Sequence, residues 1–189
     1  MSGPTRPSRL RFLRHPLVLV GSVLGVVVVV VAAAVGAYWF QPWKLFTNTT
    51  VDEPLPASVA GPSAADPGLQ GPVVLSQGEF VGQEHDTSGT AQLLRLPDDS
   101  MLVRIDDLDT SDGPELKVWL TDAPVTPGTG RAGVFDDGRW VDLGALKGNR
   151  GSANYPVPAG TDVTGLDSVS IWCDRFNVSF GAAELVPVA

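Results

Sequence analysis

Cysteine and histidine are scarce in this sequence: its 189 residues include one cysteine, Cys173, and two histidines. A single thiol cannot close a disulfide within the chain. The folded part must therefore rely on its apolar core, unless Cys173 has a partner elsewhere. One cysteine and two histidines also exclude a structural zinc site, and no Cys-x-x-Cys-His is present for covalent haem attachment. The sequence therefore predicts no metal site.

Acidic residues are absent from residues 1–50, which hold five basic residues. The remaining 139 residues carry all 21 acids against eight basic residues, a net charge of −13. This asymmetry is typical of a membrane-targeting N-terminus joined to an acidic folded module. An acidic module repels phosphate groups, which disfavours nucleic acid as a partner.

Charge is also absent from residues 17–40, which include the valine run 26–31. A helix of this length measures about 36 Å, enough to cross a hydrocarbon core of roughly 30 Å. Four arginines precede this stretch, and the positive-inside rule then places residues 1–16 in the cytoplasm as a basic tail. The sequence predicts a single-pass protein of the cell membrane, with a cytoplasmic N-terminus and an extracytoplasmic remainder.

A cleaved signal peptide is the alternative interpretation of the same stretch. Val35-Gly36-Ala37 resembles a small-residue cleavage site. Signal peptides usually have apolar cores of only about 7–15 residues, so the length favours an uncleaved signal anchor. Both interpretations place the rest of the chain outside the cytoplasm.

Residues 41–77 are rich in proline, alanine, serine and glycine. A segment of this composition cannot bury a core and usually forms an extended, semi-stiff linker. We therefore expect a spacer that holds the following domain away from the bilayer.

Sustained helical periodicity is absent from residues 78–189, which form the predicted domain. Short apolar runs separated by turn residues recur instead. We predict strands over residues 79–83, 90–96, 100–105, 115–120, 139–143, 152–157, 169–173, 176–180 and 184–186. Many short strands at close spacing indicate an all-β fold, and we predict an antiparallel β-sandwich. Residues 122–138, with four glycines and two prolines, are expected to form a long loop.

The stretch 168–181 shows the clearest alternation. Val169, Ile171 and Cys173 share one face, and the pattern resumes after Asp174-Arg175. Two such runs joined by a short polar break predict an antiparallel hairpin with one buried face. Cys173 is therefore expected at a strand end, on the apolar side. A basic side chain at Arg175 would favour its thiolate, whereas Asp174 would oppose it.

Four acidic residues crowd positions 106–112, but they do not follow the EF-hand spacing of acids, glycine and a final glutamate. We expect a solvated acidic turn, with a calcium site of another type as the alternative. A Cys173–His85 nucleophile pair lacks any recognisable oxyanion motif, so enzymatic activity stays an open question. Non-covalent haem is chemically allowed, with Cys173, His85 or Met101 as axial ligand. Each of these side chains also has an ordinary structural interpretation in a strand or turn.

Several segments of the predicted domain resemble the DM-thirteen domain family. They are Phe80 to Ala91 with His85 and Gly89, 112–120 (Asp-Gly-Pro-Glu-Leu-Lys-Val-Trp-Leu), 141–149 (Val-Asp-Leu-Gly-Ala-Leu-Lys-Gly-Asn), 151–158 and 169–181 with Ile-Trp-Cys. The resemblance implies a β-rich extracellular module proposed to serve electron transfer, in which a cysteine at the position of Cys173 acts as a free thiol or as a ligand of a prosthetic group. Members of the family often have a histidine at the position of His85, and the resemblance implies no role for it.

Two hypotheses for the function follow. The first is an accessory redox or electron-transfer module that uses Cys173, with haem as a possible cofactor and an unidentified redox protein as partner. The second is a non-enzymatic binding or adhesion module with a structural Cys173 and a cell-surface partner. A composition rich in Gly, Ala, Val, Asp and Arg indicates a bacterium with a GC-rich genome.

Overall fold

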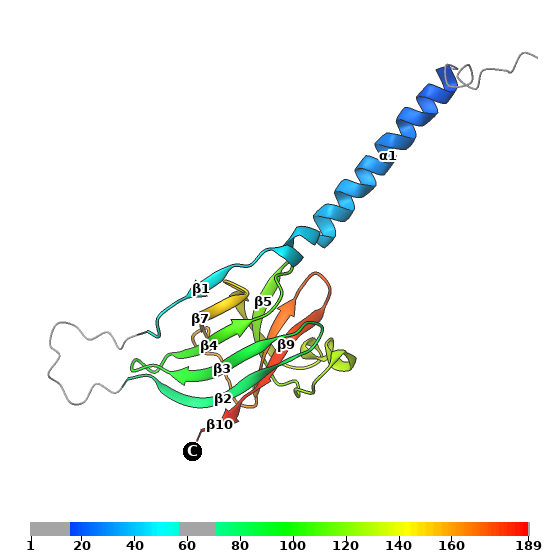
Figure 1. Cartoon of the computed structure of the whole chain (residues 1–189). Coiled ribbons are helices and arrows are strands. Elements are labelled where there is room, and N and C mark those ends of the chain that lie inside the picture. Colours follow the sequence, from blue (N-terminus) through cyan, green and yellow to red (C-terminus); the bar gives the residue numbers. More distant parts are fainter. Residues whose placement is uncertain (1–15, 57–70, 189) are drawn as a thin grey trace, which may run out of the picture. The chain divides into compact units, whose positions relative to one another are not determined.

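The computed structural model describes residues 16–56 and 71–188 (Figure 1). Most of the predicted basic tail, and residues 57–70 of the predicted spacer, lie outside these residues. The chain divides into two compact units between Pro42 and Trp43.

The first unit contains one α-helix, α1 (Pro16–Phe40). None of its residues is buried, and it is long and apolar enough to cross a membrane. This agrees with the predicted anchor, because a helix that is apolar on all sides has no polar face to turn toward water. A short 3-10 helix, η2 (Pro42–Phe46), follows it.

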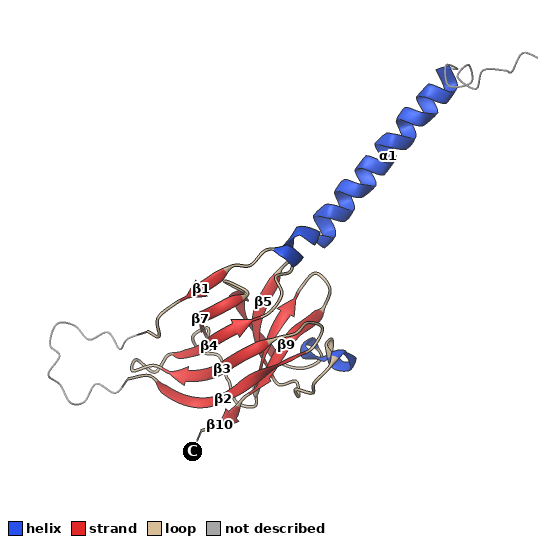
Figure 2. Ribbon diagram, viewed as in Figure 1, coloured by secondary structure: helices blue, strands red, loops and turns tan. Residues whose placement is uncertain are grey.

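The second unit is built from β-strands (Figure 2). They are β1 (Thr50–Asp52), β2 (Val73–Gly82), β3 (Ser88–Arg95), β4 (Met101–Asp109), β5 (Leu116–Thr121), β6 (Trp140–Ala145), β7 (Arg150–Pro156), β8 (Ser168–Cys173), β9 (Val178–Glu184) and β10 (Val186–Pro187). Two 3-10 turns, η3 (Thr129–Arg131) and η4 (Val134–Asp136), lie in the long loop after β5. The all-β prediction is confirmed.

The predicted antiparallel sandwich does not form. The strands make one sheet in the order β1-β7-β4-β3-β2-β9-β8-β5-β6, with β10 also paired to β2. The sheet is mixed, because β1 pairs with β7 in parallel, and it curls until β6 and β7 come into contact, giving a half-barrel. The cause is β2, whose first part pairs with β3 and whose last three residues pair with β9. Because β2 pairs with both β3 and β9, the strands form one continuous sheet. The sequence pattern had suggested two separate sheets.

The concave side of the curled sheet holds the main core. Its members come from nearly every strand and include Phe80, Val103, Ile105, Val118, Ile171, Phe180 and Cys173. The alternation in 168–181 is confirmed, because Val169, Ile171 and Cys173 all belong to this core.

The opposite side of β5, β8 and β9 is also covered, so the expectation of a single buried face is wrong. All six residues of β8 are buried. A second apolar cluster lies here, formed by Trp119, Ala123, Phe135, Trp172 and Ala182. Phe135 comes from the loop predicted over residues 122–138, which folds back over the sheet and excludes water from its outer face.

Part of the predicted spacer lies in the sheet. Thr50–Asp52 form β1, and Val73 begins β2. Within residues 41–77, local composition indicated a linker, whereas backbone pairing with β7 and β3 places these two stretches in the folded unit.

Candidate functional site

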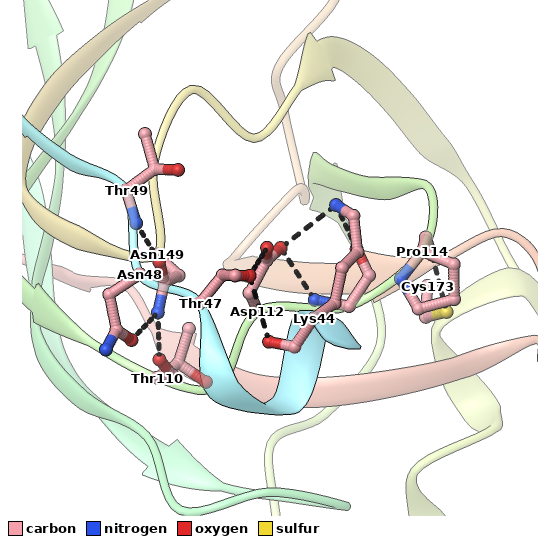
Figure 3. Close-up of polar contacts among 10 residues, drawn as sticks. Lys44, Thr47, Asn48, Thr49, Thr110, Asp112, Pro114, Asn149 and Cys173 are labelled. Carbon is pink, nitrogen blue, oxygen red and sulfur yellow. Dashed lines mark hydrogen bonds and ion pairs between the residues drawn. The ribbon is translucent and has the colours of Figure 1, made fainter. Parts of the chain in front are cut away.

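Cys173 ends β8 and faces the main core. Its side chain is fully buried, and its Sγ donates a hydrogen bond to the carbonyl of Pro114 over 3.1 Å (Figure 3). Pro114 belongs to the turn between β4 and β5, which brings that carbonyl over the end of β8 because Leu116 pairs with Cys173. The thiol therefore has the surroundings of a small core residue with one polar partner.

The electrostatic surroundings favour the neutral thiol. Burial raises the pKa of Cys173, and the nearby carboxylates Asp174 and Glu115 act in the same direction. Backbone N–H groups of Phe176 and Arg175 oppose this shift only partly. The Arg175 guanidinium pairs with Glu115, with 2.6 Å between Nη2 and Oε1, so its charge is balanced by that carboxylate. A reactive thiolate needs exposure and a stabilising positive charge, and this site offers neither.

His85 lies in the bend between β2 and β3. Its ring stacks on Phe180 with centroids 3.8 Å apart, and Nδ1 lies 3.2 Å from the Ser111 hydroxyl. Burial lowers the pKa of His85, while Glu84 and Asp86 raise it. The imidazole is thus held mainly as a neutral ring that packs on the core and bonds to a turn.

Each of the three candidate haem ligands has its own partners in the structure. Cys173 bonds to Pro114, His85 contacts Phe180 and Ser111, and Met101 packs on the core from β4. Haem also needs an apolar slot for its macrocycle. A cavity of about 530 Å³ is lined by polar groups that include Asp86, Asp109, Asp112 and Arg150. Neither this cavity nor another of about 230 Å³ is lined by Cys173 or His85, so neither of the two offers an apolar slot for haem beside these residues.

The prediction of an acidic turn over positions 106–112 is wrong for its first part, because Asp106 and Asp109 lie on β4, and the carboxylates form ion pairs. Asp106 pairs with Arg104, Asp109 with Arg150, and Asp112 with Lys44. Among residues 16–56 and 71–188, no three His, Cys, Asp or Glu side chains gather to hold a metal ion. Asp109 and Asp112 therefore link β4 and the segment after it to β7 and to Lys44, whereas Asp106 pairs within β4.

A stack of three indole rings, which the sequence analysis missed, crosses the outer face of the half-barrel. Trp119 stacks on Trp140 at 4.1 Å and on Trp172 at 4.6 Å between ring centroids. Trp119 and Trp172 alternate with core residues along their strands. This alternation could have revealed the stack, because large aromatic rings on the side of a strand opposite the core are seldom left exposed to water. Two of them indicate that another segment covers that side.

A second missed feature is the set of contacts made by residues 44–54. Figure 3 shows Lys44 and Thr47 on Asp112, and Asn48 and Thr49 on Asn149. No sequence signal in this proline-rich region pointed to such contacts, because they depend on residues about 50–100 positions away.

Comparison with known proteins identifies the family of the β-rich domain. The model of the family described as electron transfer DM13 matches residues 79–185, more than half of the chain, which confirms the resemblance to the DM-thirteen domain. No curated protein and no solved structure matches the sequence. The match runs from β2 to just beyond β9, and the chain therefore belongs to the DM13 family.

Proposed function

We propose that this protein is a membrane-anchored, extracytoplasmic accessory domain of an electron-transfer system, and that Cys173 supports the fold rather than carrying electrons. The DM13 match suggests the electron-transfer-related role, and α1 is compatible with anchoring. The arginines before α1 support a cytoplasmic N-terminus. On this proposal the domain binds a redox protein without being an enzyme.

The observation that carries the assignment of Cys173 is its burial with a satisfied hydrogen bond. A thiol exchanges electrons with a partner disulfide only when the partner can reach the sulfur and the thiolate is populated. Cys173 has no exposed surface, and burial raises the pKa of its thiol. In the folded state, therefore, a partner cannot reach the sulfur and the thiolate is disfavoured.

Thiol labelling of the full chain tests this assignment. A maleimide at neutral pH should modify native Cys173 at least about a hundredfold more slowly than the urea-unfolded chain, because modification waits for the domain to open. Ser100→Cys in a Cys173→Ser background is the positive control, since residue 100 is exposed in the turn before β4. Fast modification of native Cys173 would restore the thiol redox hypothesis.

Haem titration is the companion measurement. Added haem should give the same Soret band with the unaltered chain as with Cys173→Ser, because the sulfur is enclosed by the core. A Soret shift that disappears in Cys173→Ser would make Cys173 a haem ligand and overturn the proposed structural role.

A further inference from the structure

The turn Lys147–Gly151 and strand β7 hold an extended stretch of the chain that lies outside the matched family region. We call residues 44–54 the strap. We infer that this turn, together with β7, is a docking site for the strap, and that the strap is a releasable latch that sets the length of chain between α1 and the domain. The tether part of this inference rests on the membrane anchoring proposed above. The docking part does not.

The strap docks through a parallel backbone ladder. Thr50, Val51 and Asp52 pair with Arg150, Gly151 and Ser152. The ladder is closed at both ends, because Arg150 donates to the Thr49 carbonyl and Glu53 N–H donates to the Ser152 carbonyl, over 3.2 and 2.8 Å. This pairing also covers the edge of β7, which would otherwise expose unpaired backbone groups.

Asn149 recognises the strap with its side chain. Its Oδ1 accepts from the Thr49 N–H at 2.7 Å, and its Nδ2 donates to Asn48 Oδ1 at 2.8 Å and to the Thr110 carbonyl at 2.7 Å. The side chain is only 2% exposed. The Asn149 amide thus uses its NH₂ group and its oxygen to hold the strap against the turn between β4 and β5.

Two glycines make room for the strap. A Cβ at Gly148 would lie 2.6 Å from the Thr49 carbonyl oxygen and 2.8 Å from Val51 Cγ2. A Cβ at Gly151 would clash with the Val51 carbonyl, and Gly151 has φ of 91°, which favours glycine. The motif Lys-Gly-Asn-x-Gly of residues 147–151 therefore has the shape of a cradle for another stretch of backbone.

Charged contacts fix both ends of the strap. At one end, Lys44 Nζ lies 3.1 Å from Asp112 Oδ1 and donates to the Gly113 carbonyl at 3.0 Å. At the other, the Glu53 carboxylate accepts from Lys147 Nζ at 2.8 and 2.9 Å and from the Asn154 N–H at 2.8 Å. The Lys147 ammonium is itself held over the Tyr155 ring.

These contacts are polar, which makes release possible without unfolding the core. Val51 is the member of the strap that packs on the main core, and no strap side chain that the structure describes is buried. Segments with few buried apolar contacts open locally at lower cost than the core strands. When docked, the strap leaves residues 41–43 between α1 and the first contact. Once released, residues 41–72 join α1 to β2 and can span about 100 Å if extended.

Hydrogen exchange on the full chain in detergent tests the docking. Asn149→Ala should speed exchange of the Thr49–Glu53 amides about tenfold or more, from the loss of its hydrogen bonds, while β4 amides change little. Gln92→Ala on β3 is the matched control, and it should change the exchange rates of neither the strap amides nor the β4 amides. The latch is overturned if strap and β4 amides exchange at one common rate in the unaltered chain, or if Asn149→Ala accelerates both equally.

Energy transfer in nanodiscs tests the tether. A donor dye at Ser100→Cys in the Cys173→Ser background, with acceptor lipids in the bilayer, should give less transfer after Asn149→Ala is added. Equal transfer with and without Asn149→Ala, alongside faster strap exchange, would overturn the tether role and leave the docking site. Absence of transfer in every variant would instead overturn membrane anchoring, and with it that part of the proposed function.

Discussion

Lys117 lies on β5 between two carboxylates from neighbouring strand segments. Its Nζ is 2.7 Å from Asp142 Oδ2 on β6 and 2.7 Å from Asp174 Oδ2 in the turn after β8. These two hydrogen bonds raise the pKa of Lys117 well above its ordinary value. The charge of Asp174, which adjoins Cys173 in the sequence, is thereby balanced by an ammonium group.

Replacing Lys117 tests this network at the residue scale. Lys117→Met should lower the free energy of unfolding by about 1 kcal/mol, because two carboxylates lose their common partner in a partly exposed site. The deficit should shrink in 1 M salt, which screens the repulsion that remains. Urea titrations at low and high salt measure the loss of unfolding free energy and its dependence on salt. Arg95→Met, at an exposed position on β3, is the control. A salt-independent deficit would point to lost packing of the lysine stem instead.

Glu53 should make strap docking depend on pH. Its hydrogen bond from Lys147, and next the one from the Asn154 N–H, lower the pKa of its carboxyl in the docked state. A lowered pKa stabilises docking at pH above the ordinary carboxyl pKa, and this contribution is lost as pH falls through the docked value. Strap protection in hydrogen exchange should therefore exceed that of Glu53→Gln by a constant factor above about pH 5, and the difference should shrink as pH falls through the docked pKa, which lies below the ordinary carboxyl value. A difference that persists unchanged at acid pH would mean that the charge of Glu53 is not what holds the strap.

At the scale of elements, the loop between β5 and β6 acts as part of the core. Its 3-10 turn η4 places Phe135, fully buried, beside Trp119 and Trp172. The Phe135 carbonyl also accepts a hydrogen bond from the Thr121 hydroxyl at 3.2 Å. This loop gives β8 its second covered face, so the strand that ends at Cys173 has water on neither side.

Truncating Phe135 measures how much the loop contributes. Phe135→Ala should lower the free energy of unfolding by about 3–5 kcal/mol, because a large buried ring is replaced by a cavity next to two indoles. Tryptophan emission should move to longer wavelength as water reaches Trp119 and Trp172. Val134→Ala, a half-buried neighbour in the same turn, should cost clearly less. Equal losses for both variants would show that the loop is not anchored by the phenylalanine.

The whole molecule combines an apolar helix with an acidic domain. Residues 17–40 carry no charge, whereas the remainder after residue 50 carries a net charge of −13. A helix of this kind partitions into lipid, while an acidic surface stays in water. We therefore expect the two parts of the chain to favour different environments.

Membrane fractionation checks this division. The full chain should remain in the membrane pellet after alkaline carbonate extraction, and a chain lacking residues 1–42 should appear in the soluble fraction. Protease added outside intact cells should degrade the β-domain and spare the N-terminal tail if the arginines set the orientation. Recovery of the full chain in the soluble fraction, shortened at its N-terminus, would identify the helix as a cleaved signal instead.

Sequence by itself determined the classes of structure in this protein and the core face of its clearest strand. The charge-free run at 17–40 forms α1, which is long and apolar enough to cross a membrane, because length and hydropathy are local properties of the sequence. Alternation in 169–173 placed Val169, Ile171 and Cys173 on the core face correctly, because strand side chains must alternate. The family was also evident from short motifs that stand in order along the chain.

Only the tertiary structure decided how these strands join and what surrounds Cys173. Alternation says which face is buried but not which strands pair, so the partner switch along β2 and the parallel pairing of β1 were not predictable. The hydrogen-bond partner of Cys173 is a carbonyl 59 residues earlier, and the strap contacts an asparagine about 100 residues later. Contacts over such separations are set by the path of the whole sheet, which local patterns do not encode.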